Sequence, residues 1–330
     1  MAAKHLSVTV ESWPIRGGFR IARGSKTEAA VIIVTIAEDG KAGRGECVPY
    51  ARYGESIESV RAAIERLRGE VERGLTREAL QDLLPAGAAR NALDCALIDL
   101  EAKIKGRRAY ELLGLPAPKP VQTAYTLSLD TPDAMGKAAA DAAAKRYGLL
   151  KLKVAGAGDL DRVQAVRRNA PLAKLIVDAN EGWSESDLVT LTPELAGLGV
   201  ALIEQPLKAG EDEALHSFRS PVPLCADEGC HTRADLPAIL GRYTHINVKL
   251  DKAGGLTEAA GLAREAQRLG LKLMVGCMVS TSLAMAPASL LCGLAQYTDL
   301  DGPLLLARDR EPAMRYDADC IYPPDPSLWG

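Results

Sequence analysis

The sequence has few of the features that mark secreted, membrane-bound or nucleic-acid-binding proteins. Its seven cysteines are an odd number without a CxxC pair, which argues against a disulfide framework and a thiolate zinc site. No segment approaches the roughly 20 apolar residues that a membrane helix needs, and the first residues lack the apolar core of a signal peptide. The net charge is only −3 and basic residues are dispersed, so nothing indicates nucleic acid or an anionic membrane as a partner. We therefore expect a soluble cytoplasmic protein.

The first hundred or so of the 330 residues predict a small α+β unit. Residues 6–12 and 30–36 are typical of strands, and a glycine-rich return follows at 43–47. Helical patterns follow over 56–72 and 85–105. No Gly-x-Gly-x-x-Gly fingerprint follows the first strand, which weakens a dinucleotide-binding reading.

After a proline-rich linker at 116–120, short apolar runs alternate with helical stretches. The runs lie at 121–127, 149–154, 174–179, 200–203, 222–226, 245–250, 271–277 and 296–300. This alternation predicts a parallel sheet covered by helices, and about eight units favour a TIM-type α/β barrel over an open sheet.

Charged residues recur at the ends of these predicted strands. They stand at positions 153, 178, 204, 227 and 249, which is close to one strand–helix unit each time. In a barrel such positions converge on one mouth. Asp178, Glu204 and Asp227 supply hard oxygen ligands without Cys or His, which suits Mg²⁺ rather than zinc. The alternative is three unrelated acids that cap helix N-termini.

Two lysines complete the predicted site. Lys153 and Lys249 follow the second and sixth strands, on opposite sides of an eight-stranded barrel. A neighbouring divalent cation would favour the neutral amine that a general base requires. The alternative is a pair of surface or ion-paired lysines. Metal and lysines together suggest a 1,1-proton transfer, in which one lysine removes an α-proton and the other returns one to the opposite face.

These motifs resemble the enolase superfamily, in particular the dipeptide epimerases of its muconate-lactonizing subgroup. The resemblance rests on Lys151-x-Lys153, Asp178-x-Asn180, Glu204-Gln205-Pro206, Asp227-Glu228, Asn247-x-Lys249 and the segment 250–255. It implies an α+β capping domain over a modified (β/α)7β barrel, divided here into residues 1–116, 117–306 and a returning segment 307–330. It further implies one Mg²⁺ per subunit, Asn180 and Asn247 beside the ligands, and two flexible lid loops at about 16–26 and 49–56.

The resemblance also implies a substrate. Asp299 and Asp301 resemble the acids that hold the α-ammonium of a dipeptide, and Arg23 resembles the loop arginine that pairs with a glutamate side chain in the L-Ala-D/L-Glu epimerases. Lys151, Thr126 and Cys277 match positions that line the family's pocket. The implied role is epimerisation of murein peptides during their recycling, in an enzyme that can form homo-oligomers. Another dipeptide specificity, an N-acylamino acid racemase, a cycloisomerase, a syn-dehydratase and an inactive metal-binding barrel remain alternatives.

Overall fold

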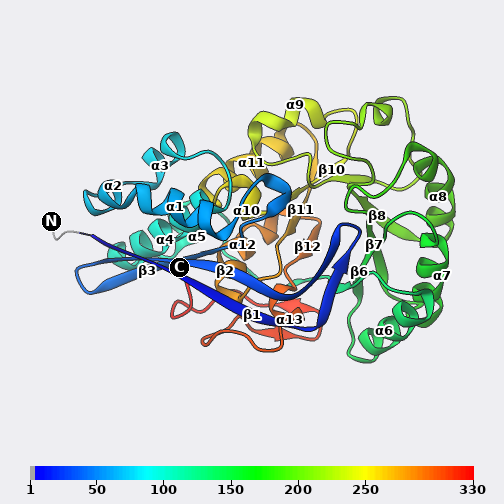
Figure 1. Cartoon of the computed structure of the whole chain (residues 1–330), viewed down its shortest axis with the longest axis horizontal. Coiled ribbons are helices and arrows are strands. Elements are labelled where there is room, and N and C mark those ends of the chain that lie inside the picture. The colour runs from blue at the N-terminus through cyan, green and yellow to red at the C-terminus, as the bar shows by residue number, and fades with distance from the viewer. Residues whose placement is uncertain (1–3) are drawn as a thin grey trace.

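The computed structural model describes residues 4–330 and begins with an antiparallel sheet (Figure 1). Its strands are β1 (His5–Ile21), β2 (Gly24–Glu38) and β3 (Lys41–Cys47), in the order β1-β2-β3. The helices that follow are α1 (Ile57–Arg66), α2 (Arg68–Glu72), α3 (Arg77–Leu83), α4 (Ala88–Lys105) and α5 (Ala109–Leu112). A Cβ on Gly43 or Gly45 would collide with backbone carbonyls of α4, so glycine at these two positions lets the helix pack directly on β3.

Eight parallel strands form the barrel, in sequential order around the sheet. They are β5 (Tyr125–Leu127), β6 (Leu149–Lys153), β7 (Lys174–Asp178), β8 (Val200–Glu204), β9 (Leu224–Ala226), β10 (His245–Val248), β11 (Lys272–Gly276) and β12 (Tyr297–Asp299). The backbone N–H of Ala124 donates to the carbonyl of Thr298 at 2.8 Å and brings the two edges together. The predicted α/β barrel with an α+β cap is thereby confirmed.

The helices of this part of the chain lie mostly outside the barrel (Figure 1), whereas the last one, over residues 302–305, borders its mouth. They are α6 (Pro132–Ala144), α7 (Asp159–Asn169), α8 (Glu185–Gly197), α9 (Leu236–Ile239), α10 (Leu250–Ala253), α11 (Leu256–Arg268), α12 (Ser282–Ser289) and α13 (Gly302–Leu305), with 3-10 turns η1 (Ala51–Tyr53), η2 (Glu213–His216), η3 (Arg233–Asp235) and η4 (Cys292–Leu294). Inside the barrel, inward side chains of successive strands form a buried layer that includes Leu149, Ile176, Leu202 and Met274. Among the described helices, none is long and apolar enough to cross a bilayer.

Two expectations need correction. The apolar run 121–127 is not one strand: β4 (Val121–Gln122) pairs with β14 (Cys320–Ile321), beside β13 (Tyr316–Asp317), in a separate small sheet, and only β5 joins the barrel. Residues 16–26 are not an open loop, because β1 and β2 pair down to Ile21 and Gly24 across a short turn. This β1–β2 hairpin reaches across the barrel mouth (Figure 1). Residues 49–56 contain η1 and otherwise lack regular structure, as expected for a loop.

The chain's C-terminal segment packs back against the cap. The indole N–H of Trp329 donates to the carbonyl of Arg44 at 2.9 Å, and Arg310 pairs with the buried Glu46 of β3 at 3.0 Å. Glu46 also accepts the backbone N–H of Thr281 at 2.8 Å, at the start of α12. One buried carboxylate therefore ties cap, barrel and C-terminal segment together.

Candidate active site

The two predicted catalytic lysines face one cavity from opposite walls of the barrel. Lys153 is the last residue of β6, and Lys249 directly follows β10. Both side chains are buried, and each amine binds a different acid: Lys153 Nζ lies 2.6 Å from Asp178 Oδ2, and Lys249 Nζ lies 2.6 Å from Asp227 Oδ2. The strand order places three strands between β6 and β10 in either direction. A substrate in the cavity would therefore meet one amine on each face.

The three predicted metal ligands lie where the strand periodicity places them. Asp178 ends β7, Glu204 ends β8, and Asp227 directly follows β9, and all three are fully buried. Lys151 lies among them, with Nζ 3.1 Å from Asp178, 2.8 Å from Glu204 and 2.8 Å from Asp299. Parallel strands thus deliver acids and amines to one layer below the mouth.

The pKa values of the side chains in this layer follow from their burial and from the close packing of acids with lysines. Burial opposes ionisation of Asp178, but Lys153 and Lys151 outweigh it and hold the pKa of this carboxyl well below its usual range. Burial and the neighbouring Asp178 instead raise the pKa of Glu204 to about 7. Burial also opposes the charge of Lys249, yet Asp227 and Glu204 raise the pKa of its amine well above the ordinary value. The neutral amine expected of a base therefore depends on added positive charge beside these acids.

The donors fit a hard divalent cation. Every candidate ligand atom is oxygen, and buried Asn180 Oδ1 and Asn247 Oδ1 have no hydrogen-bond partner in the described chain. Asn247 Nδ2 donates to Glu204 Oε1 at 2.8 Å, and the backbone N–H of Asn180 donates to Asp178 Oδ1 at 2.9 Å, so both asparagines orient the acids. No three acidic, Cys or His side chains within residues 4–330 form a ready cage, and the ammonium of Lys151 lies between the carboxylates. A bound cation would contact these carboxylates in place of the Lys151 ammonium.

Asp299 and Asp301 stand together at the end of β12. Asp299 Oδ2 forms an ion pair with Lys151 Nζ, whereas buried Asp299 Oδ1 has no hydrogen-bond partner in the described chain. Asp301 accepts the backbone N–H of Thr126 at 2.6 Å. Burial and the neighbouring Asp299 raise the pKa of Asp301 to about 7. A cationic group that enters here would recover the cost of placing two acids side by side.

Arg23 lies at the turn of the β1–β2 hairpin, but its guanidinium is already engaged. It contacts Glu228 Oε1 at 2.6 Å, Glu181 Oε2 at 3.0 Å, the carbonyl of Asn180 at 2.6 Å and the Tyr50 hydroxyl at 3.1 Å. Asn180 and Glu181 adopt positive φ values of 45° and 67°, a strained turn that directs them toward the hairpin. Arg23 therefore fastens the hairpin to the barrel.

A cavity of about 790 Å³ lies between the hairpin and the barrel mouth. Its lining includes ten residues predicted from sequence: Arg23, Thr126, Lys151, Lys153, Asn180, Asp227, Lys249, Cys277, Asp299 and Asp301. Asp178, Glu204 and Asn247 are buried behind the cavity wall. Asp178 accepts a hydrogen bond from Lys153, and Glu204 accepts one from Asn247. Burial raises the pKa of the Cys277 thiol, so the thiol lines the cavity as an uncharged group and does not act as a nucleophile.

Sequence reasoning gave no role to four further residues. Phe19 lies over the amine of Lys153, the predicted base, with Nζ 5.8 Å from the ring centroid. Arg52 of η1 binds Glu181 at 2.7 Å and so holds the second lid segment. Lys252 is fully buried, and its Nζ lies 2.7 Å from Asp227 Oδ1. Glu228 was visible beside Asp227 in the sequence, but its pairing with the hairpin was not.

Similarity to known proteins agrees with this geometry. Residues 3–114 match the mandelate racemase / muconate lactonizing enzyme N-terminal domain, and residues 134–325 match the enolase C-terminal domain-like family. L-Ala-D/L-Glu epimerase of Escherichia coli is 49% identical over 311 residues, covering 94% of this chain and 97% of that protein. N-acetyl-D-glutamate racemase of a Pseudoalteromonas species is 48% identical over 304 residues, covering 91% and 95%.

Solved structures extend the similarity to the whole fold. An enolase family member from Agrobacterium tumefaciens with homology to dipeptide epimerases, with bound sodium and L-Ala-L-Glu, superposes with a TM-score of 0.96 at 49% identity, over 99% of this chain and 100% of that one. A dipeptide epimerase from Enterococcus faecalis, complexed with Mg and L-Leu-L-Tyr, gives 0.92 at 28% identity, over 98% of each chain. With both domains matched along most of its length, this chain belongs to the mandelate racemase / muconate lactonizing enzyme family of the enolase superfamily.

Proposed function

We propose that this protein is a Mg²⁺-dependent dipeptide epimerase that inverts the α-carbon of the C-terminal residue, with L-Ala-D/L-Glu as substrate. The observation that carries the proposal is the pair of buried amines on opposite walls of one cavity, Lys153 and Lys249. A single base could only remove and return a proton on the same face. Two opposed bases allow inversion.

Asp178, Glu204 and Asp227 would hold the cation, with Asn180 and Asn247 orienting the carboxylates. When bound, Mg²⁺ supplies positive charge that stabilises the carbanionic charge developed on the substrate carboxylate as the α-proton leaves.

The lysines carry the proton. In one direction Lys153 Nζ, in its neutral form, takes the α-proton, and the ammonium of Lys249 delivers a proton to the opposite face. In the other direction the roles are exchanged, because the product of one pass is the substrate of the reverse pass. Phe19 lies over Lys153, with the amine 5.8 Å from its ring centroid, and shields this amine on the side of the hairpin.

The acid pair Asp299 and Asp301, at and just beyond the end of β12, selects a free amino terminus. Asp299 Oδ1 and the carboxylate of Asp301 are oxygen acceptors that a substrate α-ammonium can bind. Lys151 fixes Asp299 through the other carboxylate oxygen, and Thr126 fixes Asp301 through its backbone N–H. Both acids are thereby held toward the cavity before substrate arrives.

An N-acylamino acid racemase is the second candidate, since the Pseudoalteromonas relative is an N-acetyl-D-glutamate racemase at 48% identity. Its chemistry at the α-carbon is the same, so the lysines and acids of the metal layer do not distinguish the two. An N-acyl group has no ammonium for Asp299 and Asp301 to bind, which is why the dipeptide is preferred.

Proton NMR in D₂O tests this proposal. With the Mg²⁺-loaded enzyme, the glutamyl α-proton signal of L-Ala-L-Glu should disappear while signals of the second diastereomer grow, and enzyme stripped by EDTA should do neither. N-acetyl-L-glutamate is run in parallel under the same conditions. Exchange of N-acetyl-L-glutamate alone would establish the racemase, and exchange of neither compound by folded, Mg²⁺-loaded enzyme would refute a proton-transfer function at this site.

The cellular setting forms part of the proposal. We infer recycling of small murein peptides in the cytoplasm, because the E. coli relative is an L-Ala-D/L-Glu epimerase and this dipeptide would be the substrate. We also retain the division into residues 1–116, 117–306 and 307–330, because the last segment packs on β3 of the cap through Arg310 and Trp329.

A further inference from the structure

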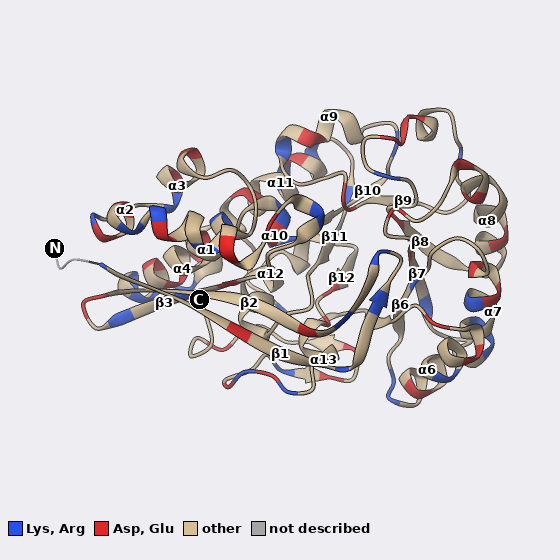
Figure 2. Cartoon of the chain, viewed as in Figure 1, with Lys and Arg blue, Asp and Glu red and all other residues tan. Residues whose placement is uncertain are grey.

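Asp227 is not held by the barrel sheet in the way that the other two candidate metal ligands are. Asp178 pairs in register with Lys153 on one side and with Glu204 on the other, so these two ligands are part of the strand ladder. In the sheet β9 lies between β8 and β10 (Figure 2), and the last residue of β9 to pair with a neighbour is Ala226. Asp227 comes one position later. Something other than strand pairing must therefore fix this ligand.

The side chain of Gln205 supplies that restraint. Gln205 follows the last residue of β8 and is fully buried. Its Oε1 accepts the backbone N–H of Asp227 at 2.8 Å and the backbone N–H of Gly229 at 3.1 Å. Its Nε2 donates to the carbonyl of Leu207 at 2.9 Å. One amide therefore holds the main chain of the ligand at both ends of the turn 227–229.

The backbone of Gln205 is strained, which indicates that its placement is enforced by its surroundings. Its φ is +33°, a value that few residues other than glycine adopt. The strained residue is fixed on both sides, because its N–H donates to the carbonyl of Cys225 at 2.9 Å and its carbonyl accepts the N–H of Glu181 at 2.9 Å. The side chain consequently leaves the end of β8 toward the turn after β9.

Two further residues set the orientation of the Gln205 amide. An amide can be turned in two ways, and only one of them presents oxygen to two N–H donors. The hydroxyl of Tyr243 donates to Asp212 Oδ2 at 2.6 Å, so its oxygen accepts Gln205 Nε2 at 2.9 Å. Burial and Asp212 raise the pKa of Tyr243, so the hydroxyl keeps its proton. Arg242 binds the other oxygen of Asp212 at 2.6 Å and holds the carboxylate in place.

We propose that Gln205 is a positioning residue that fixes Asp227 for the cation, and that Tyr243 and Asp212 hold its amide in the orientation this requires. The inference rests on the proposed function, because it concerns the metal site of that proposal. Lys252 contacts the carboxylate of Asp227 at 2.7 Å, whereas Gln205 holds its main chain, so the two restraints are complementary. Groups that orient a metal ligand in this way contribute to metal affinity without touching the metal.

Calorimetric titration with Mg²⁺ alone tests the assignment. Gln205→Met keeps the length of the side chain but cannot accept the Asp227 N–H, and its Kd should rise by about 10- to 100-fold, the usual effect of losing a group that orients a ligand. Tyr243→Phe removes only the acceptor for Nε2, and its Kd should rise about fivefold, the worth of one neutral hydrogen bond. Asp212→Asn should act in the same direction, because its amide offers one oxygen to two donors, Arg242 and Tyr243.

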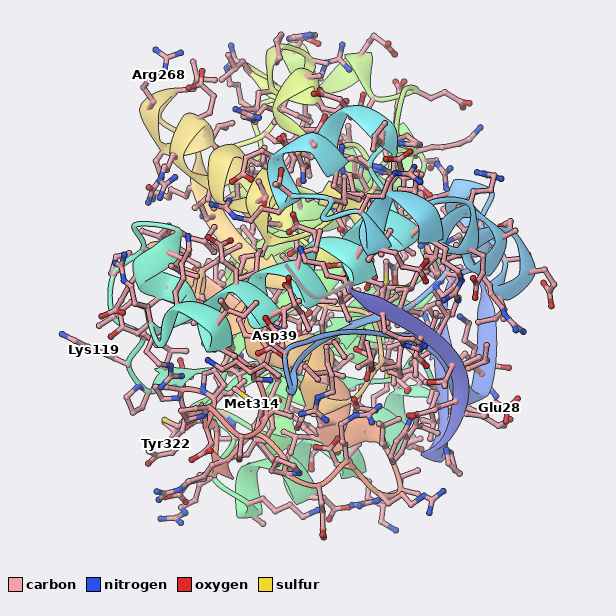
Figure 3. The ribbon with its side chains drawn as sticks, turned by 90° about the vertical axis from the view of Figure 1, so that its left-hand side faces the viewer. Glu28, Asp39, Lys119, Arg268, Met314 and Tyr322 are labelled. Carbon is pink, nitrogen blue, oxygen red and sulfur yellow. The ribbon has the colours of Figure 1, made fainter. Side chains whose placement is uncertain are left out.

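Two control variants separate metal affinity from general loss of stability. Tyr322→Phe removes a phenol hydroxyl at the edge of the molecule (Figure 3) and should keep the wild-type Kd. Trp329→Phe removes a buried N–H that donates to the carbonyl of Arg44 in the cap, so it should lower the urea midpoint and leave the Kd unchanged. In Tyr243→Phe, saturating Mg²⁺ should restore kcat, because the variant acts through the cation.

The double variant Gln205→Met with Tyr243→Phe shows whether the tyrosine acts through the glutamine. Its Kd should equal that of Gln205→Met, because the phenol then has no amide to orient. Tyr243→Phe and Asp212→Asn carry the test by themselves if Gln205→Met does not fold. Wild-type Kd values in these single variants, an equal rise in Trp329→Phe, or effects that multiply in the double variant would overturn the assignment.

The failure of this inference is distinguishable from failure of the proposed function. If the wild type binds no Mg²⁺, or binds it and exchanges no α-proton, the proposed function is wrong. If the wild type binds Mg²⁺ and epimerises L-Ala-L-Glu while the variants keep its Kd, only the role of Gln205 is wrong.

Discussion

The protonation of Asp301 should control substrate capture near neutral pH. This buried carboxyl has a pKa raised to about 7 by burial and by Asp299, and only its ionised form can pair with a substrate ammonium. A carboxyl with such a pKa is ionised in about half of the molecules at pH 7 and in about one in ten at pH 6. Since kcat/KM reports the free enzyme, it should rise with pH through this range and level off near pH 8.

The variant Asp301→Asn isolates this effect. Asparagine can keep the 2.6 Å contact with the Thr126 backbone N–H through its carbonyl oxygen, so the fold is retained, but the titrating charge is gone. We expect kcat/KM for L-Ala-L-Glu at pH 8 to fall by about 10- to 100-fold, the cost of one charge-assisted hydrogen bond. The rise between pH 6 and pH 8 should disappear.

Initial rates of epimerisation by polarimetry, from pH 5.5 to pH 8.5 with saturating Mg²⁺, give the profile. Glu204 also has a pKa raised to about 7, by burial and Asp178, and a limb due to Glu204 would survive in Asp301→Asn. A flat wild-type profile, or the same limb in wild type and Asp301→Asn, would refute the reasoning.

The remaining predictions concern stability and ligand geometry. Glu46→Ala should lower the free energy of unfolding by about 3–5 kcal/mol, because Arg310 and the Thr281 N–H lose a buried partner; urea melts with Glu38→Gln as control measure this, and a loss equal to the control's contradicts it. Burial raises the pKa of Asp251 to about 7, so its folded form binds a proton that the unfolded chain releases near pH 4, and its contribution to stability declines as pH rises from about 4 to 7. The stability of Asp251→Asn relative to wild type should therefore be higher at pH 8 than at pH 5. A difference in urea midpoint between variant and wild type that is the same at both pH values would contradict this. Lys252→Met should weaken Mg²⁺ binding by calorimetry, because Lys252 holds Asp227 at 2.7 Å, and an unchanged Kd would exclude this.

Much of the candidate site was predictable because barrel strands recur at a regular interval. Lys153, Asp178 and Glu204 are each the last residue of a strand, and the fold itself carries such residues to one mouth. Their spacing and chemical type sufficed, without knowledge of any contact. Asp299 and Lys151 came from the family resemblance instead, and their 2.8 Å contact was not predicted.

Contacts between distant segments were beyond prediction from sequence. Arg23 and Glu228 are 205 positions apart, and nothing local indicates that a hairpin would bring them to 2.6 Å. The family resemblance suggested a flexible loop at 16–26, whereas cross-strand pairing extends β1 and β2 to a short turn.

The central claim is that two lysines act on opposite faces of one carbon. Its most direct test follows α-proton exchange by NMR in D₂O, starting separately from L-Ala-L-Glu and L-Ala-D-Glu, with Lys153→Ala, Lys249→Ala and the exposed control Lys272→Ala. Both active-site variants should lose epimerisation by about 10²- to 10⁴-fold, the usual contribution of a positioned acid or base. Each should still exchange the α-proton of one diastereomer, a different one in each variant, while Lys272→Ala matches wild type. Wild-type epimerisation by either active-site variant, or exchange of the same diastereomer by both, would contradict the two-base account.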